Sequence, residues 1–319
     1  MRKTLTTLAL AASFAVSFAQ QDAQFSQNMF NKLPINPGFA GTDKAICGVL
    51  LYRQQWVSFP GAPKTGLISI DAPILQSTPL HGGVGLTVCS DQLGFDKTII
   101  AKAAYSYHLV LGPGILGIGL EAGVIQKQLA GAWISTDPYT QDAAIPDQKA
   151  SKAVFDLGLG AYYTTDNGIY FGISSTHLPQ TSFTNVNTTA AGAPVKDAYN
   201  FVNARHYYIM AGVPFNINQD IKVIPSILAK TDASSTQLDI NARVVWRNQV
   251  WAGAAYRLTD AIVALVGFQI SGLKVGYSFD LTTSNLKNYS NNTHEIMVGY
   301  CFKPVKPPGE TIHKHPRFL

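Results

Sequence analysis

Charged residues are scarce in this sequence. Asp, Glu, Lys and Arg make up 13% of its 319 residues, whereas an ordinary soluble domain has about 25%. Long apolar runs are missing as well, because the chain beyond its N-terminal region holds no stretch of about 18 apolar residues, which a membrane-spanning helix requires. These absences argue against a cytosolic enzyme and against a helical membrane protein. Hydrophobic residues nevertheless reach 46%, a combination typical of an all-β protein whose outer surface faces lipid.

Cysteines and catalytic motifs are equally sparse. Cys47, Cys89 and Cys301 are an odd number at wide spacing, which predicts neither a disulfide framework nor a metal cluster. The Gly-rich stretch 117–123 lacks the spacing of a dinucleotide-binding loop, and the seven His include no H-x-x-x-H pair. We therefore predict no enzymatic activity, no cofactor and no metal site.

The first 19 residues have the features of a secretory signal peptide. Arg2 and Lys3 precede the apolar stretch 5–18, and a small-x-small pattern ends at Ala19. A buried amphipathic helix is the alternative, but the stretch has no polar face beyond Thr and Ser. We therefore expect residues 1–19 to be removed on export.

The excess of positive over negative charge lies at the two ends of the chain. Arg2 and Lys3 contribute to the formal net charge of +5 at pH 7, and residues 303–319 carry four basic residues against Glu310 alone. The region between has no basic stripe interleaved with aromatic residues, so we predict no nucleic-acid partner.

Period-two alternation is the strongest pattern in the sequence. Phe155, Leu157 and Leu159, for example, alternate with one Asp and two Gly. Such segments suit membrane strands of about 9–11 residues, and their number is even, as in bacterial single-chain barrels. We predict an all-β fold, a transmembrane outer-membrane β-barrel of about 14 antiparallel strands embedded in a lipid membrane. The predicted strands are 44–56, 62–74, 82–92, 97–110, 114–130, 151–165, 168–178, 199–215, 221–230, 235–247, 249–258, 260–269, 271–282 and 292–302.

A soluble β-sandwich also alternates, but its strands average only about 5–6 residues. Here the polar face is rich in Gly, as in the stretch 117–123, which suits a confined interior. Both long loops, 131–150 and 179–198, follow odd-numbered strands, as expected if long loops lie outside and short turns in the periplasm. We expect the inward-facing charges to pair within the lumen. They are Lys102, Glu121, Lys127, Asp156, Asp239, Arg243, Arg257, Lys274 and Asp280.

Several stretches near both ends of the chain go beyond what a barrel requires. They read QFSQNMFN (24–31), INPGFAG (35–41), YRQQW (52–56), GAPKT (61–65), YSFDL (277–281), NYS (288–290), THEI (293–296) and PRFL (316–319). Together they closely resemble the PorP/SprF family of outer-membrane proteins, which is linked to type IX secretion and gliding in the Bacteroidota. Residues 110–270 contain few sequence motifs specific to the family. The family usually has Ala-Tyr-Ala where this chain has Gly38-Phe39-Ala40.

The resemblance implies a role in protein secretion. It implies a barrel that anchors a secreted surface protein, an adhesin, through the C-terminal domain of that protein, and that contacts periplasmic components of the type IX secretion system. The alternative is a passive porin or a transporter of small hydrophobic solutes, because a barrel of this size can hold or pass a solute.

Residues 20–43 precede the first strand and are predicted to form a plug in the lumen or a segment across its periplasmic mouth. The apolar groups include Phe25, Met29, Phe30 and Phe39, too many for a solvated leader, and polar groups such as Asn36 can meet the lumen wall. A disordered leader is the alternative.

The predicted barrel spans 44–302, and its long external loops form a predicted site for a surface partner. Trp133, Tyr139 and Phe183 are aromatic residues of the long external loops and are predicted anchors for a surface partner. The alternative is that the apolar loop residues pack on one another as a cap.

The tail 303–319 is predicted to be a periplasmic docking segment. Its prolines favour an extended linker, which delivers a basic and aromatic terminus made of Pro316, Arg317, Phe318 and Leu319. A frayed chain end without a partner is the alternative.

Overall fold

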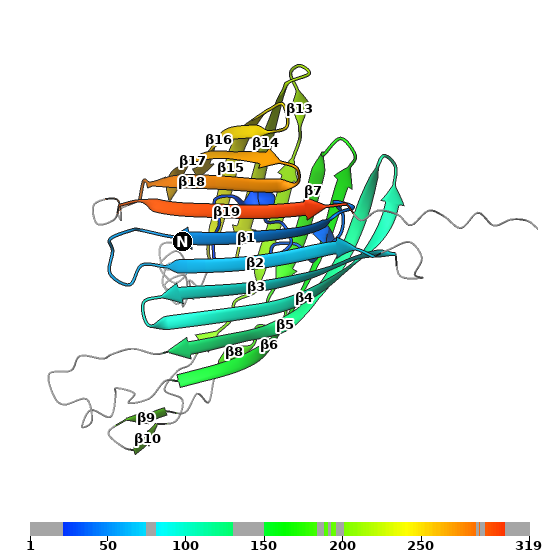
Figure 1. Cartoon of the computed structure of the whole chain (residues 1–319). Helices are drawn as coiled ribbons and strands as arrows, with labels where there is room; N and C mark the ends of the chain where they lie inside the picture. The colour runs from blue at the N-terminus through cyan, green and yellow to red at the C-terminus, as the bar shows by residue number, and fades with distance from the viewer. Residues whose placement is uncertain are drawn as a thin grey trace, which may run out of the picture.

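The computed structural model describes residues 22–74, 81–129, 150–183, 188–190, 193–195, 201–284, 287 and 291–303. They form a closed antiparallel β-barrel in which neighbouring wall strands pair and the last strand pairs with the first (Figure 1). The fourteen wall strands are β1 (Ile46–Gln54), β2 (Lys64–Pro73), β3 (Gly82–Leu93), β4 (Asp96–Leu111), β5 (Gly114–Leu129), β6 (Ala150–Thr165), β7 (Tyr170–Thr176), β12 (His206–Gly212), β14 (Ile221–Thr231), β15 (Thr236–Trp246), β16 (Val250–Arg257), β17 (Ala261–Ile270), β18 (Leu273–Thr282) and β19 (Thr293–Phe302). The predicted fold class and all fourteen strands are confirmed.

The largest shift concerns the predicted strand 199–215, since the wall strand β12 begins only at His206. Upstream, the two residues of β11 (Phe201–Val202) pair instead with β8 (Ser182–Phe183). A separate small pair, β9 (Thr188–Ala190) and β10 (Ala193–Val195), lies in the same connection. The long loop between β7 and β12 therefore contains strand pairs of its own.

Proline does not disrupt strand β14. The Pro225 carbonyl accepts a hydrogen bond from the Val213 amide at 3.2 Å. On this side, β14 faces the interruption between β12 and the two-residue strand β13 (Phe215–Asn216). The missing Pro N–H therefore falls at a gap in the ladder, where proline is tolerated.

The alternation turns one row of each strand outward and the other into the lumen. On β19, Ile296, Val298 and Tyr300 are exposed, whereas Glu295 and Met297, which belong to the alternate row, are fully buried. This inverts the usual arrangement of a soluble protein and matches a barrel whose outer face meets lipid. Among the described residues, no helix is long and apolar enough to span a membrane.

The two ends of the barrel differ. We call the end where β1 begins and β19 ends the terminal mouth; its turns are short, such as 112–113 between β4 and β5. The two longest connections between wall strands, 130–149 and 177–205, begin and end at the opposite end of the barrel, called the loop mouth. The predicted sorting of long loops onto odd-numbered strands is thus confirmed.

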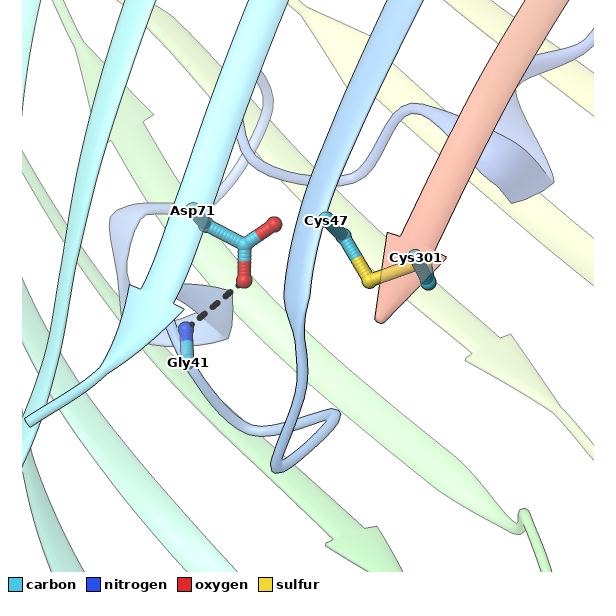
Figure 2. The surroundings of a disulfide bond; sticks show 4 residues. All are labelled: Gly41, Cys47, Asp71 and Cys301. Carbon is cyan, nitrogen blue, oxygen red and sulfur yellow. Dashed lines mark hydrogen bonds between the residues drawn. A yellow bond between two sulfur atoms is a disulfide. The ribbon is translucent and has the colours of Figure 1, made fainter. Parts of the chain in front are cut away.

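Cys47 and Cys301 form a disulfide bond, which corrects the prediction that the cysteines form no such framework. They lie directly opposite each other on β1 and β19, with their Cα atoms 4.1 Å apart (Figure 2). The prediction was wrong because wide sequence spacing says nothing about distance once the ring closes. Cys89 is a buried free thiol.

Residues 22–43, called the inner segment here, lie within the lumen and lead to the start of β1 at the terminal mouth. Two short 3-10 turns, η1 (Asn28–Phe30) and η2 (Pro37–Phe39), are its regular structure. The apolar side chains of the segment join wall residues in buried clusters; Phe25, for example, packs with Leu51 and Met297. The interior of this barrel is therefore a packed core to which its own N-terminal segment contributes.

Candidate functional site: a lumen occupied by the N-terminal segment

The inner segment packs directly against three glycines of the barrel wall, Gly117, Gly119 and Gly160, which we call the glycine bed. On the inner face of β5 and β6, a Cβ atom at Gly117 would overlap the Gly38 carbonyl, one at Gly119 would overlap Pro37, and one at Gly160 would overlap the Asn36 side chain. Without side chains at these positions, the backbone of η2 approaches the wall directly. The Gly-rich polar face that the sequence shows is thus explained by close contact with the segment.

Asn36 connects the segment to two strands. Its side-chain oxygen accepts from the Gly38 amide at 2.9 Å and so caps η2. Its side-chain amide donates to the Ala161 carbonyl on β6 at 2.9 Å and to the Ile173 carbonyl on β7 at 3.1 Å. Asn36 has no exposed surface, and a buried amide with three bonds is costly to replace.

A buried carboxylate holds the other part of the segment. The two oxygens of Glu295 on β19 accept from the backbone amides of Ser26 and Gln27, each at 2.8 Å. Arg53 on β1 pairs with Glu295 at 3.1 Å and with Asp280 on β18 at 2.8 Å. These charges are at most 2% exposed, so each needs its partners to offset desolvation.

Ser26 brings this network onto the segment itself. Its hydroxyl donates to Asp280 at 2.6 Å and accepts from Arg53 at 2.7 Å. Arg257 on β16 adds a second guanidinium, 3.1 Å from Asp280 and 3.2 Å from the Ser26 hydroxyl. Breaking the contact between segment and wall would therefore leave buried charges without part of their hydrogen bonding, which opposes release.

Two of the cavities in the lumen lie at opposite mouths and share no lining residue. The cavity at the terminal mouth is about 440 Å³ and is basic: Lys32, Lys222, Arg243 and Lys274 line it against two carboxylates. Among the described residues, none of these four cations makes an ion pair, so the predicted pairing fails for Arg243 and Lys274. It is confirmed elsewhere, as between Lys102 and Glu121 at 2.8 Å.

Lys32 is the inner segment's own contribution to this basic cavity. Its ammonium donates to the Tyr162 hydroxyl at 2.8 Å and lies 3.6 Å from the centre of the Tyr170 ring. Burial lowers the pKa of Lys32 to about 8; Asp43 opposes this change, and the nearby Arg243 and Lys274 add to it. The amine is therefore held in a site where its charge is costly.

The cavity at the loop mouth is larger, about 580 Å³, and mostly acidic. Asp22, Asp91, Asp96 and Asp260 line it together with Lys127. The inner segment therefore separates an acidic chamber from a basic one.

The structure places the predicted plug residues inside the barrel. Phe25, Met29 and Phe39 are at most 9% exposed, Asn36 is fully buried, and the Phe30 ring lies 5.0 Å from that of Trp251 on β16. This placement fits neither a solvated leader nor a segment confined to one mouth.

Other predicted residues are not brought together. Phe183 is 1% exposed and packs with Ile125 and Phe201 at the loop mouth, so it is not an exposed anchor, and its burial fits the alternative of a cap. Trp133, Tyr139 and the tail residues 316–319 lie outside the described residues.

The inward-facing charges predicted from the sequence omit Arg53 and Glu295, and the contact between Asp22 and His177 was not predicted. The alternation of β1 and β19 could have identified the first two, because Arg53 and Glu295 lie on the inward rows of those strands. No sequence signal pointed to the contact between Asp22 and His177. Asp22 belongs to the inner segment and His177 follows β7, and they meet only in the folded lumen.

A family model described as "Type IX secretion system membrane protein PorP/SprF" matches residues 17–300. No curated protein matches the chain. Among solved structures, the outer membrane protein Omp33 of Acinetobacter baumannii is similar at 10% identity and a TM-score of 0.41, covering 81% of this chain and 96% of that one. The translocator domain of the autotransporter NalP from Neisseria meningitidis is similar at 11% identity and a TM-score of 0.44, covering 87% of this chain and 96% of the other.

Proposed function

Because this outer-membrane barrel belongs to the PorP/SprF family of type IX secretion system membrane proteins, we propose that it retains a secreted surface protein, an adhesin, rather than passing solutes. The partner binds from outside through its C-terminal domain. The terminal mouth faces the periplasm, where the tail 303–319 docks to components of the secretion system. The signal peptide 1–19 delivers the chain to this location.

The occupied lumen is the observation that carries the proposal. A passive porin needs a water-filled path, whereas here a segment of the chain is tied to opposite parts of the wall by Glu295 and by Asn36. Its release would expose buried charges. A rigid, filled barrel provides a stable platform for a partner at either mouth.

The acidic chamber at the loop mouth supports an external binding site. Carboxylates on a rigid wall attract a partner surface that carries Lys or Arg and speed its association. We therefore expect the bound domain of the surface protein to present basic side chains toward Asp91 and Asp260.

Purification of the barrel from native outer membranes under mild detergent tests the proposal. We expect one large surface protein to co-purify, and we expect truncation after Lys303 to leave the barrel inserted while surface attachment fails. Asp91→Asn with Asp260→Asn should weaken retention, and Asp166→Asn, at the opposite mouth, is the matched control. A barrel that purifies without a surface protein and conducts ions as a stable open pore would support the solute transporter instead.

A further inference from the structure

Three groups that can ligate a metal converge where the inner segment begins. Asp22 comes from the segment, His177 follows β7, and His206 begins β12. Their ligand atoms all lie within 4.8 Å of one another. Both His side chains are 2% exposed and that of Asp22 is 24% exposed, so the cluster is largely shielded but borders the acidic chamber.

Both imidazoles are oriented by a second hydrogen bond. His177 Nδ1 lies 2.8 Å from the Asp156 carboxylate on β6, and His206 Nδ1 lies 3.0 Å from the Ala204 carbonyl. A ring nitrogen facing such an oxygen carries the proton and donates it, which leaves His206 Nε2 to accept. His177 Nε2 also faces a carboxylate oxygen, that of Asp22, so a metal ion at this position takes the place of its proton. This is the arrangement of metal-ligating His, whose other nitrogen nearly always donates to a carboxylate or a backbone carbonyl.

Both rings contact Asp22, but in different ways. His177 Nε2 is 2.8 Å from one Asp22 carboxylate oxygen. His206 Nε2 accepts from the Asp22 backbone amide at 3.3 Å, and His206 Nδ1 lies 3.9 Å from the other carboxylate oxygen. The other carboxylate oxygen accepts from the Tyr208 hydroxyl at 2.7 Å. Two imidazoles from the barrel wall and one carboxylate from the inner segment provide three ligands beside the chamber, the number found in zinc sites that keep an open fourth position.

The local charge favours a divalent cation. Lys102 pairs with Glu121 at 2.8 Å and with Asp156 at 3.0 Å, so one ammonium faces two carboxylates. Asp22 adds a third negative charge. With neutral imidazoles, this group has two negative charges in excess. Lys230 is the other nearby cation, and it donates to the backbone carbonyl of Asp22 rather than to its carboxylate.

We propose that Asp22, His177 and His206 bind a divalent transition-metal ion of the Zn²⁺ type, and that the ion fastens the start of the inner segment to the barrel wall. Nitrogen-rich ligand sets of this kind select Zn²⁺ and its neighbours over Ca²⁺ or Mg²⁺. The ligands come from three segments far apart in sequence, which is why no spacing motif predicted them. The site is independent of the identity of the surface partner.

The test uses the full-length barrel in detergent, stripped with a chelator and dialysed against Zn²⁺, with bound metal counted by mass spectrometry. We expect one tightly bound Zn²⁺ per barrel. His177→Gln and His206→Gln should each weaken binding by roughly 100-fold, and Asp156→Asn by about 10- to 100-fold through its hydrogen bond to His177. His294→Gln, a His outside the cluster whose Nδ1 lies 2.6 Å from the Tyr277 hydroxyl, is the matched control.

A spectroscopic measurement on the unmodified barrel guards against variants that fail to fold. X-ray absorption of the Zn²⁺-loaded barrel should show only N and O ligands at about 2.0–2.1 Å, including two imidazoles. Absence of stoichiometric Zn²⁺ binding in the unmodified barrel, or equal binding in the His177→Gln and His294→Gln variants, would overturn the proposal. The cluster would then be an ion pair in which a proton on His177 bridges Asp22 and Asp156.

Discussion

Cys47 and Cys301 are bonded to each other although 254 residues separate them, because the first and last strands of a closed barrel are neighbours. The bond spans the one seam in the wall where the pairing strands are not joined by a nearby loop. It therefore closes residues 47–301, which hold the barrel strands, into a covalent ring.

The disulfide should stabilise the barrel strongly. A covalent link that closes a loop of this length lowers the conformational entropy of the unfolded chain. In the chain-entropy model this raises the free energy of unfolding by about 5 kcal/mol. We expect reductant to lower the temperature at which the barrel unfolds on gels, both in the unmodified chain and in Cys89→Ala. A reductant effect that persists in the Cys47→Ser/Cys301→Ser double variant would contradict this role of the seam.

Gly119→Ala should displace the inner segment. The added methyl overlaps the backbone of Pro37, which cannot move away without losing the contacts of η2. Lys32 is the only Lys or Arg between residues 22 and 43, so tryptic cleavage after Lys32 reports release. Gly66→Ala is the matched control, since a Cβ there meets no atom within 4 Å. Equal protection of Lys32 in both variants would show that the glycine bed does not position the segment.

Asn36 should hold the segment mainly through its donated hydrogen bonds. Asn36→Asp keeps the cap on Gly38 but cannot donate to the carbonyls of Ala161 and Ile173, whereas Asn36→Ala loses both functions. Leaving such buried groups unpaired costs about 1–3 kcal/mol each. We expect both variants to raise single-channel conductance in planar bilayers while the barrel still resists heat. If Asn36→Asp behaves like the unmodified chain, Asn36 holds the segment mainly by accepting the hydrogen bond from Gly38 and not by donating to the wall.

Closure of the lumen should strengthen as the pH rises above 8. The pKa of Lys32 is about 8 when the segment is docked, against an ordinary value of 10.5. Between these values the released segment binds a proton that the docked one does not, so higher pH favours docking. Below pH 8 both forms are protonated, and the full cost of burying the Lys32 charge opposes docking. We expect closed-state lifetimes to lengthen from pH 8 to 10 in the unmodified chain, and less in Lys32→Met. Indistinguishable pH profiles would exclude Lys32 as the titrating group.

The barrel could be predicted from the amino-acid pattern alone. Period-two alternation is a local property of each strand, so the fourteen strands, their lipid-facing rows and the parity of the loops could be predicted without any long-range contact. The outer-membrane location followed from that pattern and from the family resemblance. The apolar groups of residues 20–43 likewise indicated that this segment does not remain in solvent.

Which distant residues meet could be read from the folded barrel and not from the pattern. Closure of the ring brought Cys47 to Cys301, and the path of the inner segment carried Asp22 to His177 and His206. Burial of Phe183 also depended on the fold, because the same aromatic residue in a loop can serve as an exposed anchor or as packing. Alternation encodes which face of a strand is inside, whereas contacts across the lumen depend on the barrel's closure and on what fills it.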